Sequence, residues 1–130
     1  EKFKECSNQV AFIDYKSGCS FGIYSTYVPV ACKSISYHQC YNKNIFEANK
    51  WYFIAVVRDD DNEKVDLYVN GEKQTPVSST DYWSTNVSDK LTIGARTNGT
   101  TLFNGVMSDF RIYATKLSED DIKTLYEYRS

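Results

Sequence analysis

The chain has 130 residues, of which 42% are hydrophobic and 25% charged, a composition that excludes a disordered chain and fits one globular domain. Its 15 basic and 17 acidic residues give a formal net charge of −2. This balance removes the usual electrostatic case for binding nucleic acid or an anionic membrane surface. No apolar run approaches the length of a membrane span, so we expect no membrane insertion.

Short strands dominate the first forty residues. Phe21–Tyr24 and Tyr27–Cys32 predict a β-hairpin closed by a two-residue turn, and Val10–Tyr15 and Lys33–His38 predict a strand on either side of it. Pro29 interrupts the return strand of the hairpin. Because proline cannot donate a ladder hydrogen bond, this strand should lie at a sheet edge or carry a bulge.

All four cysteines lie in this first part, at Cys6, Cys19, Cys32 and Cys40. An even, clustered count predicts two disulfides and an oxidising compartment, so we expect an extracellular or cell-surface protein. The alternative is a zinc site formed by these thiols and the single histidine, His38, but no C-x-x-C spacing supports it. Of the three possible connectivities, the hairpin favours Cys19 with Cys32, which leaves Cys6 for Cys40.

Three later segments also predict strands. The continuous apolar run Trp51–Val57 is typical of a strand that is buried on both faces, with the indole of Trp51 in the core. Leu91–Gly94 is a shorter strand signal. Val106–Tyr113 predicts the final strand of the chain.

The segment Val65–Val69 alternates between apolar and polar residues. Its odd-numbered residues should face the core, and its even-numbered residues, Asp66 and Tyr68, should point outward. Asn70-Gly71 follows and is typical of a type I′ hairpin turn, because both positions of that turn need positive φ. Lys73–Val77 should return from this turn as a strand.

The C-terminal segment carries the helix signal. Ser118 and Asp121 have the spacing of a capping box, and Leu117 and Ile122 occupy the positions of a hydrophobic staple. The apolar stripe of this helix consists of Ile122, Leu125 and Tyr126. Many short strands followed by one short helix indicate an all-β fold, an antiparallel β-sandwich formed by residues 1–130 as a single domain.

Four segments in order carry short strand motifs: Asn49–Asp59, Val65–Glu72, Leu91–Ala95 and Phe103–Ile122. Together they resemble the laminin G-like, concanavalin A-like lectin family. The resemblance implies a jelly-roll sandwich, and that fold hosts both sugar-binding and protein-binding domains. Members of the family usually begin with further strands that are not seen here before Glu1. We expect a partner chain or an upstream segment to supply them, or else a shortened fold; an open sheet edge would then serve assembly.

The acidic residues of the sequence do not form a recognisable catalytic pattern. The E-x-D-x-x-E pattern by which glycosidases of this fold pair their carboxylates is absent, so we expect no enzymatic activity. Asp59 and Asp61 lie in an oxygen-rich loop that could bind Ca²⁺, although a solvated hairpin loop is the favoured interpretation. The resemblance adds Asp109, which lies where some relatives place an acidic residue that helps to bind Ca²⁺.

A sugar site needs an aromatic platform beside polar groups, because sugars present apolar C–H faces ringed by hydroxyls. Tyr82 and Trp83 form the best such pair, and they lie in a loop. The flanking polar residues and the secondary candidates are Asp81, Asn86, Asp89, Tyr68 and Asn98. The alternative, which stays open, is that Tyr82 and Trp83 anchor their loop over the end of the sandwich.

These patterns predict an extracellular carbohydrate-binding module or lectin that performs no reaction and in which calcium could assist binding. Its partner would be a glycan. The alternative is a structural or adhesive domain of a larger surface protein or assembly, whose partner would be a cell-surface protein. Fold alone cannot choose between them.

Overall fold

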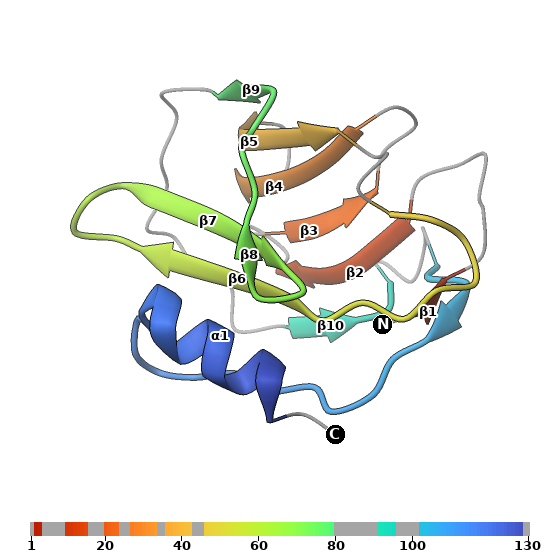
Figure 1. The fold of residues 1–130 in the computed structure, drawn as a ribbon. Helices are drawn as coiled ribbons and strands as arrows, with labels where there is room; N and C mark the ends of the chain where they lie inside the picture. Colours follow the sequence, from red (N-terminus) through yellow and green to blue (C-terminus); the bar gives the residue numbers. More distant parts are fainter. Residues whose placement is uncertain are drawn as a thin grey trace.

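A computed structural model describes residues 2–3, 10–15, 20–23, 27–33, 36–42, 46–79, 91–95 and 102–128. In these ranges the chain forms three antiparallel sheets and a helix, α1 (Glu119–Glu127), as Figure 1 shows. The helix is too short to cross a membrane, and no other helix of the described ranges could do so. The all-β fold with one C-terminal helix is confirmed.

The largest sheet has six strands in the order β10-β2-β3-β4-β5-β9. Their bounds are β2 (Val10–Tyr15), β3 (Ser20–Ile23), β4 (Tyr27–Lys33), β5 (Ser36–Asn42), β9 (Ser78–Ser79) and β10 (Leu91–Ile93). The predicted hairpin is confirmed, because Ser20 pairs with Ala31 and Phe21 with Val30. The disulfides stay predictions, since Cys6 and Cys19 lie outside the described residues.

The strand that contains Pro29 lies inside this sheet, between β3 and β5, and not at its edge. Its register with β5 shifts between Val30 and Ala31, one residue pair beyond the pair Pro29–Cys40. Of the two predicted ways to accommodate the proline, the structure therefore uses the bulge, which takes up the interruption of the ladder.

The second sheet consists of β6 (Ile54–Asp59), β7 (Lys64–Val69) and β8 (Glu72–Lys73), in that order. The predicted turn is confirmed, because Asn70 and Gly71 both have positive φ, 52° and 80°, and Val69 pairs with Glu72 across it. The side chain of Asn70 also accepts a hydrogen bond from the N–H of Phe53 at 3.0 Å. The return strand is shorter than the predicted Lys73–Val77.

The third sheet pairs β1 (Lys2–Phe3) with β11 (Gly105–Val106). The predicted final strand Val106–Tyr113 is therefore wrong beyond Val106: residues 107–113 form no ladder with any described strand. This segment runs on toward α1 along the lower side of the view in Figure 1.

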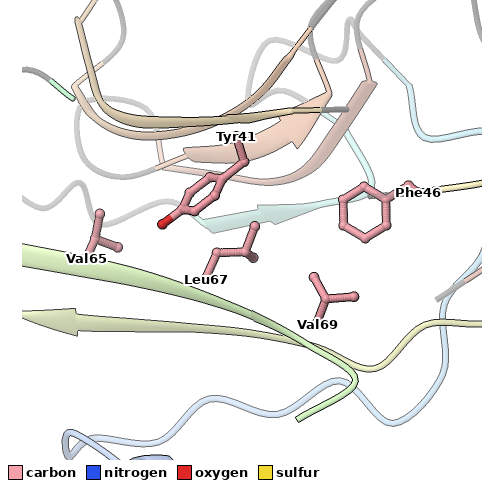
Figure 2. Close-up of a cluster of buried hydrophobic side chains, with 5 residues drawn as sticks. All are labelled: Tyr41, Phe46, Val65, Leu67 and Val69. Atoms are coloured by element: carbon pink, nitrogen blue, oxygen red, sulfur yellow. The ribbon is translucent and has the colours of Figure 1, made fainter. Parts of the chain in front are cut away.

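The core lies between the six-stranded sheet and β7. Figure 2 shows its five buried side chains, Tyr41, Phe46, Val65, Leu67 and Val69. Three of them come from alternate positions of β7, as the sequence predicted, and Leu67 has no exposed surface. Partly buried side chains pack around this cluster: Tyr52, Ile54, Phe103 and Met107. The inward face of β7 thus fixes the second sheet against the first.

The other face of β7 is covered, which corrects the expectation that Tyr68 points into solvent. Only 3% of Tyr68 is exposed, and its neighbours include Glu119 at the start of α1. The predicted capping box between Ser118 and Asp121 is present, and Ile122 of the helix is buried. The alternation of this strand was predicted correctly, but the helix that covers the second face could not be placed from strand periodicity.

The expectation of a doubly buried strand at Trp51–Val57 is also wrong. Trp51 is 53% exposed and Val56 41% exposed. Trp51 precedes β6, which begins at Ile54, and β6 itself has only one described neighbour, β7, and so forms an edge of its sheet. A continuous apolar run does not by itself show that a strand has partners on both sides.

Candidate functional site

Most residues of the predicted sugar site lie outside the described part of the chain. These are Asp81, Tyr82, Trp83, Asn86, Asp89 and Asn98. Their role stays a prediction. Of the predicted ligand residues, Tyr68 is described, and its burial between β7 and α1 removes it from any surface that a sugar could reach.

Asp59 stands at the end of β6, where the chain enters the predicted polar loop. Its Oδ2 accepts hydrogen bonds from Lys116 Nζ at 2.8 Å and from Asn62 Nδ2 at 2.9 Å. The bonds from Lys116 and Asn62 lower the pKa of Asp59 to about 2. The carboxylate is therefore occupied within the chain: it closes the loop and ties the segment before α1 to β6.

Asp59 gives the protein a specific acid sensitivity. Because its pKa is about 2 in the folded chain and 3.8 without these partners, its stabilising effect is complete above pH 3.8 and is lost as the pH falls toward 2. We expect Asp59→Asn to be less stable than the unchanged chain at neutral pH, with the two converging at about pH 2. Urea unfolding followed by circular dichroism across this range measures the difference.

The control for this prediction is Asp61→Asn, in the same turn but exposed. The stability of Asp61→Asn should depend on pH in the same way as the stability of the unchanged chain. Some acid sensitivity remains in both variants, because hydrogen bonds with Ser118 also lower the pKa of Asp121. If Asp59→Asn and Asp61→Asn gave the same profile, the ion pair with Lys116 would not be the cause.

Asp109 is held by a different cation. Its two oxygens accept hydrogen bonds from Arg111, at 2.7 Å from Nε and 3.0 Å from Nη2. This two-point pairing is a strong geometry for a guanidinium and a carboxylate. Asp109 also has a positive φ of 54°. The residue therefore stabilises a bend in the exposed segment 107–113.

The three predicted calcium ligands are not brought together. Within the ranges that the structure describes, no three aspartate, glutamate, histidine or cysteine side chains are placed to hold a metal ion. Asp59 and Asp109 each bind a cationic side chain, and Ca²⁺ would have to displace those cations to gain the six to eight oxygens that it prefers. These carboxylates as arranged do not fit a calcium site.

Sequence reasoning missed two features of this region. Lys116 meets Asp59 across a separation of 57 residues, and no local pattern could have signalled that pair. Trp51 was assigned to the core but is 53% exposed, and the residue before it in the chain, Lys50, forms an ion pair with Glu47 at 2.6 Å. An exposed indole offers a flat apolar face of the kind on which a sugar ring can stack.

Comparison with known proteins agrees with this architecture. The family described as the concanavalin A-like lectin/glucanases superfamily, in its laminin G branch, matches residues 8–123. The chain belongs to this family, as the motifs of its second half indicated. None of the curated proteins compared with the chain matches it.

Two solved structures illustrate the shared fold. A candidate carbohydrate-binding protein from Bacteroides ovatus is 22% identical, with a TM-score of 0.70 over 94% of this chain and 37% of its own. A structure of botulinum neurotoxin type C, whose cell entry depends on two ganglioside molecules, is 21% identical, with a TM-score of 0.61 over 98% of this chain and 33% of its own. The chain thus spans about a third of the length of each. At these identities the similarity shows the fold alone.

Proposed function

We propose that the chain is a carbohydrate-binding module that performs no reaction and acts outside the cell. The observation that carries this proposal is family membership across residues 8–123, supported by two solved proteins of the same fold that are associated with carbohydrate or ganglioside binding. Glycosidases of this fold need a pair of free carboxylates flanking the bond. Among the described acidic residues, Asp59 and Asp109 are both engaged by cations, which favours binding over catalysis.

The proposed sugar-binding site consists of aromatic side chains. Tyr82 and Trp83 remain the primary candidates from the sequence, and Trp51 joins them because its indole is exposed. Indole and phenol rings offer flat apolar faces to sugar C–H groups, while their polar edges reach water or hydroxyls.

A glycan array tests the function and the site together. We expect the chain to bind a coherent set of glycans, and Trp83→Ala to weaken that binding about tenfold or more, since a buried aromatic anchor is typically worth that much. Trp51→Ala is the comparison variant, and Val77→Ala, an exposed apolar residue elsewhere, is the control that should change nothing.

The outcomes of the array separate the site from the function. Loss of binding in Trp51→Ala but not in Trp83→Ala would contradict the predicted loop and leave the function standing. Absence of binding to every glycan would contradict the function itself. The same array run with millimolar calcium and with a chelator tests the prediction of calcium assistance, for which the described carboxylates offer no ligand set.

A protein-interaction domain is the second candidate, and a specific observation favours it. The part of the sequence between β10 and α1 exposes several large apolar side chains: Leu102, Val106, Phe110, Ile112 and Tyr113. If these side chains form one patch on the surface, they would suit a protein interface, because contiguous exposed apolar residues mark interaction surfaces more often than isolated ones do. In this case the domain would serve adhesion or assembly at the cell surface, as part of a larger protein.

A further inference from the structure

The turn Asn70-Gly71 has a chemical reactivity that is independent of the core and of the proposed sugar site. Asparagine before glycine is prone to spontaneous deamidation, because glycine has no side chain to hinder attack by its backbone nitrogen on the asparagine amide. In this reaction the nitrogen of Gly71 forms a bond with Cγ of Asn70, and the Cγ–Nδ2 bond breaks. Nδ2 leaves as ammonia with the proton of the Gly71 nitrogen. Water then opens the resulting succinimide ring, which yields aspartate or isoaspartate.

The folded turn holds the reacting atoms apart. Asn70 and Gly71 have φ of 52° and 80°, as in a type I′ turn, whose first central residue has ψ of about 30°. At that ψ the nitrogen of Gly71 is nearly anti to Cβ of Asn70, whereas closing the succinimide ring requires the two atoms to be nearly eclipsed. The main chain must therefore rotate out of the turn before the reaction can occur.

Two hydrogen bonds with Phe53 oppose that rotation. The N–H of Asn70 donates to the C=O of Phe53 at 2.8 Å, and Oδ1 of Asn70 accepts from the N–H of Phe53 at 3.0 Å. The backbone and the side chain of Asn70 are thus both tied to the residue before β6. The side-chain bond is partly buried, so breaking it without a new partner is unfavourable.

Helix α1 covers the same turn. The ring of Tyr126 lies against Gly71, since a methyl group added to Gly71 would stand 3.0 Å from Cδ1 of that ring. The ring also packs on Phe53, with the two ring centroids 5.8 Å apart. Because Tyr126 contacts both the turn and the residue to which the turn is bonded, a large rotation at Gly71 requires Tyr126 to move.

We propose that Asn70 is a deamidation site that the docked helix α1 keeps closed, and that its isoaspartate product holds the turn open. Modification proceeds in molecules in which Tyr126 has left Gly71 and the two bonds with Phe53 have broken. The site therefore converts a transient opening of this corner of the second sheet into a covalent change. This proposal does not depend on the proposed sugar binding.

The two products of deamidation differ in their effect on the turn. Aspartate retains Oδ1, the atom that accepts the bond from Phe53, and Asp-Gly is a preferred type I′ sequence like Asn-Gly. Isoaspartate carries the main chain through the former side chain and so adds a methylene group to the turn. The longer main chain cannot keep Val69 paired with Glu72 across the turn. Isoaspartate thus loosens β8 and, through its contacts with the turn and β8, α1.

Ageing of the complete chain at mildly alkaline pH, followed by peptide mapping with mass spectrometry, tests the closed site. We expect Asn70 to deamidate at least about tenfold more slowly in the folded chain than in the same chain held unfolded in urea, since protection follows the free energy of local opening. Asn104, which also precedes a glycine and is exposed, is the internal reference within each sample.

Two tyrosine variants test whether α1 closes the site. Tyr126→Ala removes the ring over Gly71 and should accelerate deamidation of Asn70 about fivefold or more, without a matching change at Asn104. Tyr128→Ala is the matched control, because Tyr128 is 81% exposed, and it should leave the rate at Asn70 unchanged. If Tyr126→Ala does not fold, the comparison of the folded and unfolded forms of the unchanged chain remains a complete test.

The products are compared by hydrogen exchange. Asn70→Asp reproduces the aspartate product and should leave the exchange of the α1 and β8 amides as it is in the unchanged chain. The isoaspartate form, obtained by ageing the chain in urea, refolding it and separating it by chromatography, should exchange these amides about tenfold faster or more.

Equal rates at Asn70 in the folded and unfolded chain would overturn the proposal. Equal acceleration by Tyr126→Ala and Tyr128→Ala, or acceleration of Asn70 and Asn104 together in a folded Tyr126→Ala chain, would show that α1 does not close the site. Exchange that is the same in the isoaspartate form and the unchanged chain would contradict an open turn in the product. A negative glycan array would leave this test intact, because no sugar takes part in it.

Discussion

Replacing Leu67 by alanine is expected to lower the free energy of unfolding by about 3 kcal/mol, the largest loss for a single aliphatic side chain of the core. Leu67 is fully buried and lies at the centre of the cluster formed by β7 with Tyr41 and Phe46. Truncation removes its transfer free energy and leaves a cavity that the paired strands cannot easily close. Urea unfolding followed by circular dichroism measures the change.

The matched control is Val56→Ala, at the position directly opposite Leu67 on β6. Because 41% of Val56 is exposed, we expect its truncation to cost no more than about 1 kcal/mol. Equal losses at the two positions would mean that β6 is covered in solution, which would contradict an open edge. The pair of variants therefore reports on the core and on the edge in one experiment.

Local patterns predicted the parts of this fold in which near neighbours decide the conformation. Asn70-Gly71 specifies its turn because both residues tolerate positive φ, and Ser118 with Asp121 specifies the helix start because each side chain bonds the backbone of the other. The alternation of β7 also needed no tertiary information to be recognised.

The sequence-based predictions that were wrong concern the neighbours of a strand, which its own sequence does not report. Trp51–Val57 has the composition of a buried strand, but burial depends on a neighbour that no described strand provides. Residues 109–113 alternate like a strand, yet Asp109 and Arg111 pair within the segment and no ladder forms. Strand composition signals that a segment suits a sheet, and the presence of a pairing partner is a separate, non-local fact.

The candidate site shows the same limit. An oxygen-rich loop was visible in the sequence, but the cation that neutralises Asp59 is Lys116, far along the chain. Charge density in a loop therefore did not reveal whether its carboxylates were free to bind a metal. Pairing over long sequence separations decides that question, and periodicity does not report it.

Replacing Tyr68 by alanine is expected to lower the free energy of unfolding by about 3 kcal/mol or more, as for other buried aromatic residues. Tyr68 fills the space between β7 and α1 with only 3% of its surface exposed. Burial raises the pKa of its hydroxyl, and the carboxylates of Asp66 and Glu119 raise it further. We expect thermal and urea unfolding to show the loss directly.

Tyr68→Phe separates a structural role from the ligand role that the sequence suggested. Phenylalanine keeps the packing under α1 and loses only the hydroxyl contact with Glu119, so we expect a loss of about 1 kcal/mol and an unchanged glycan profile. If Tyr68 touched a sugar, this variant would instead change the array and hardly affect unfolding. Because a buried hydroxyl stabilises the contact with the helix and an exposed one would meet ligand, these two measurements decide whether Tyr68 has a structural role or contacts a ligand.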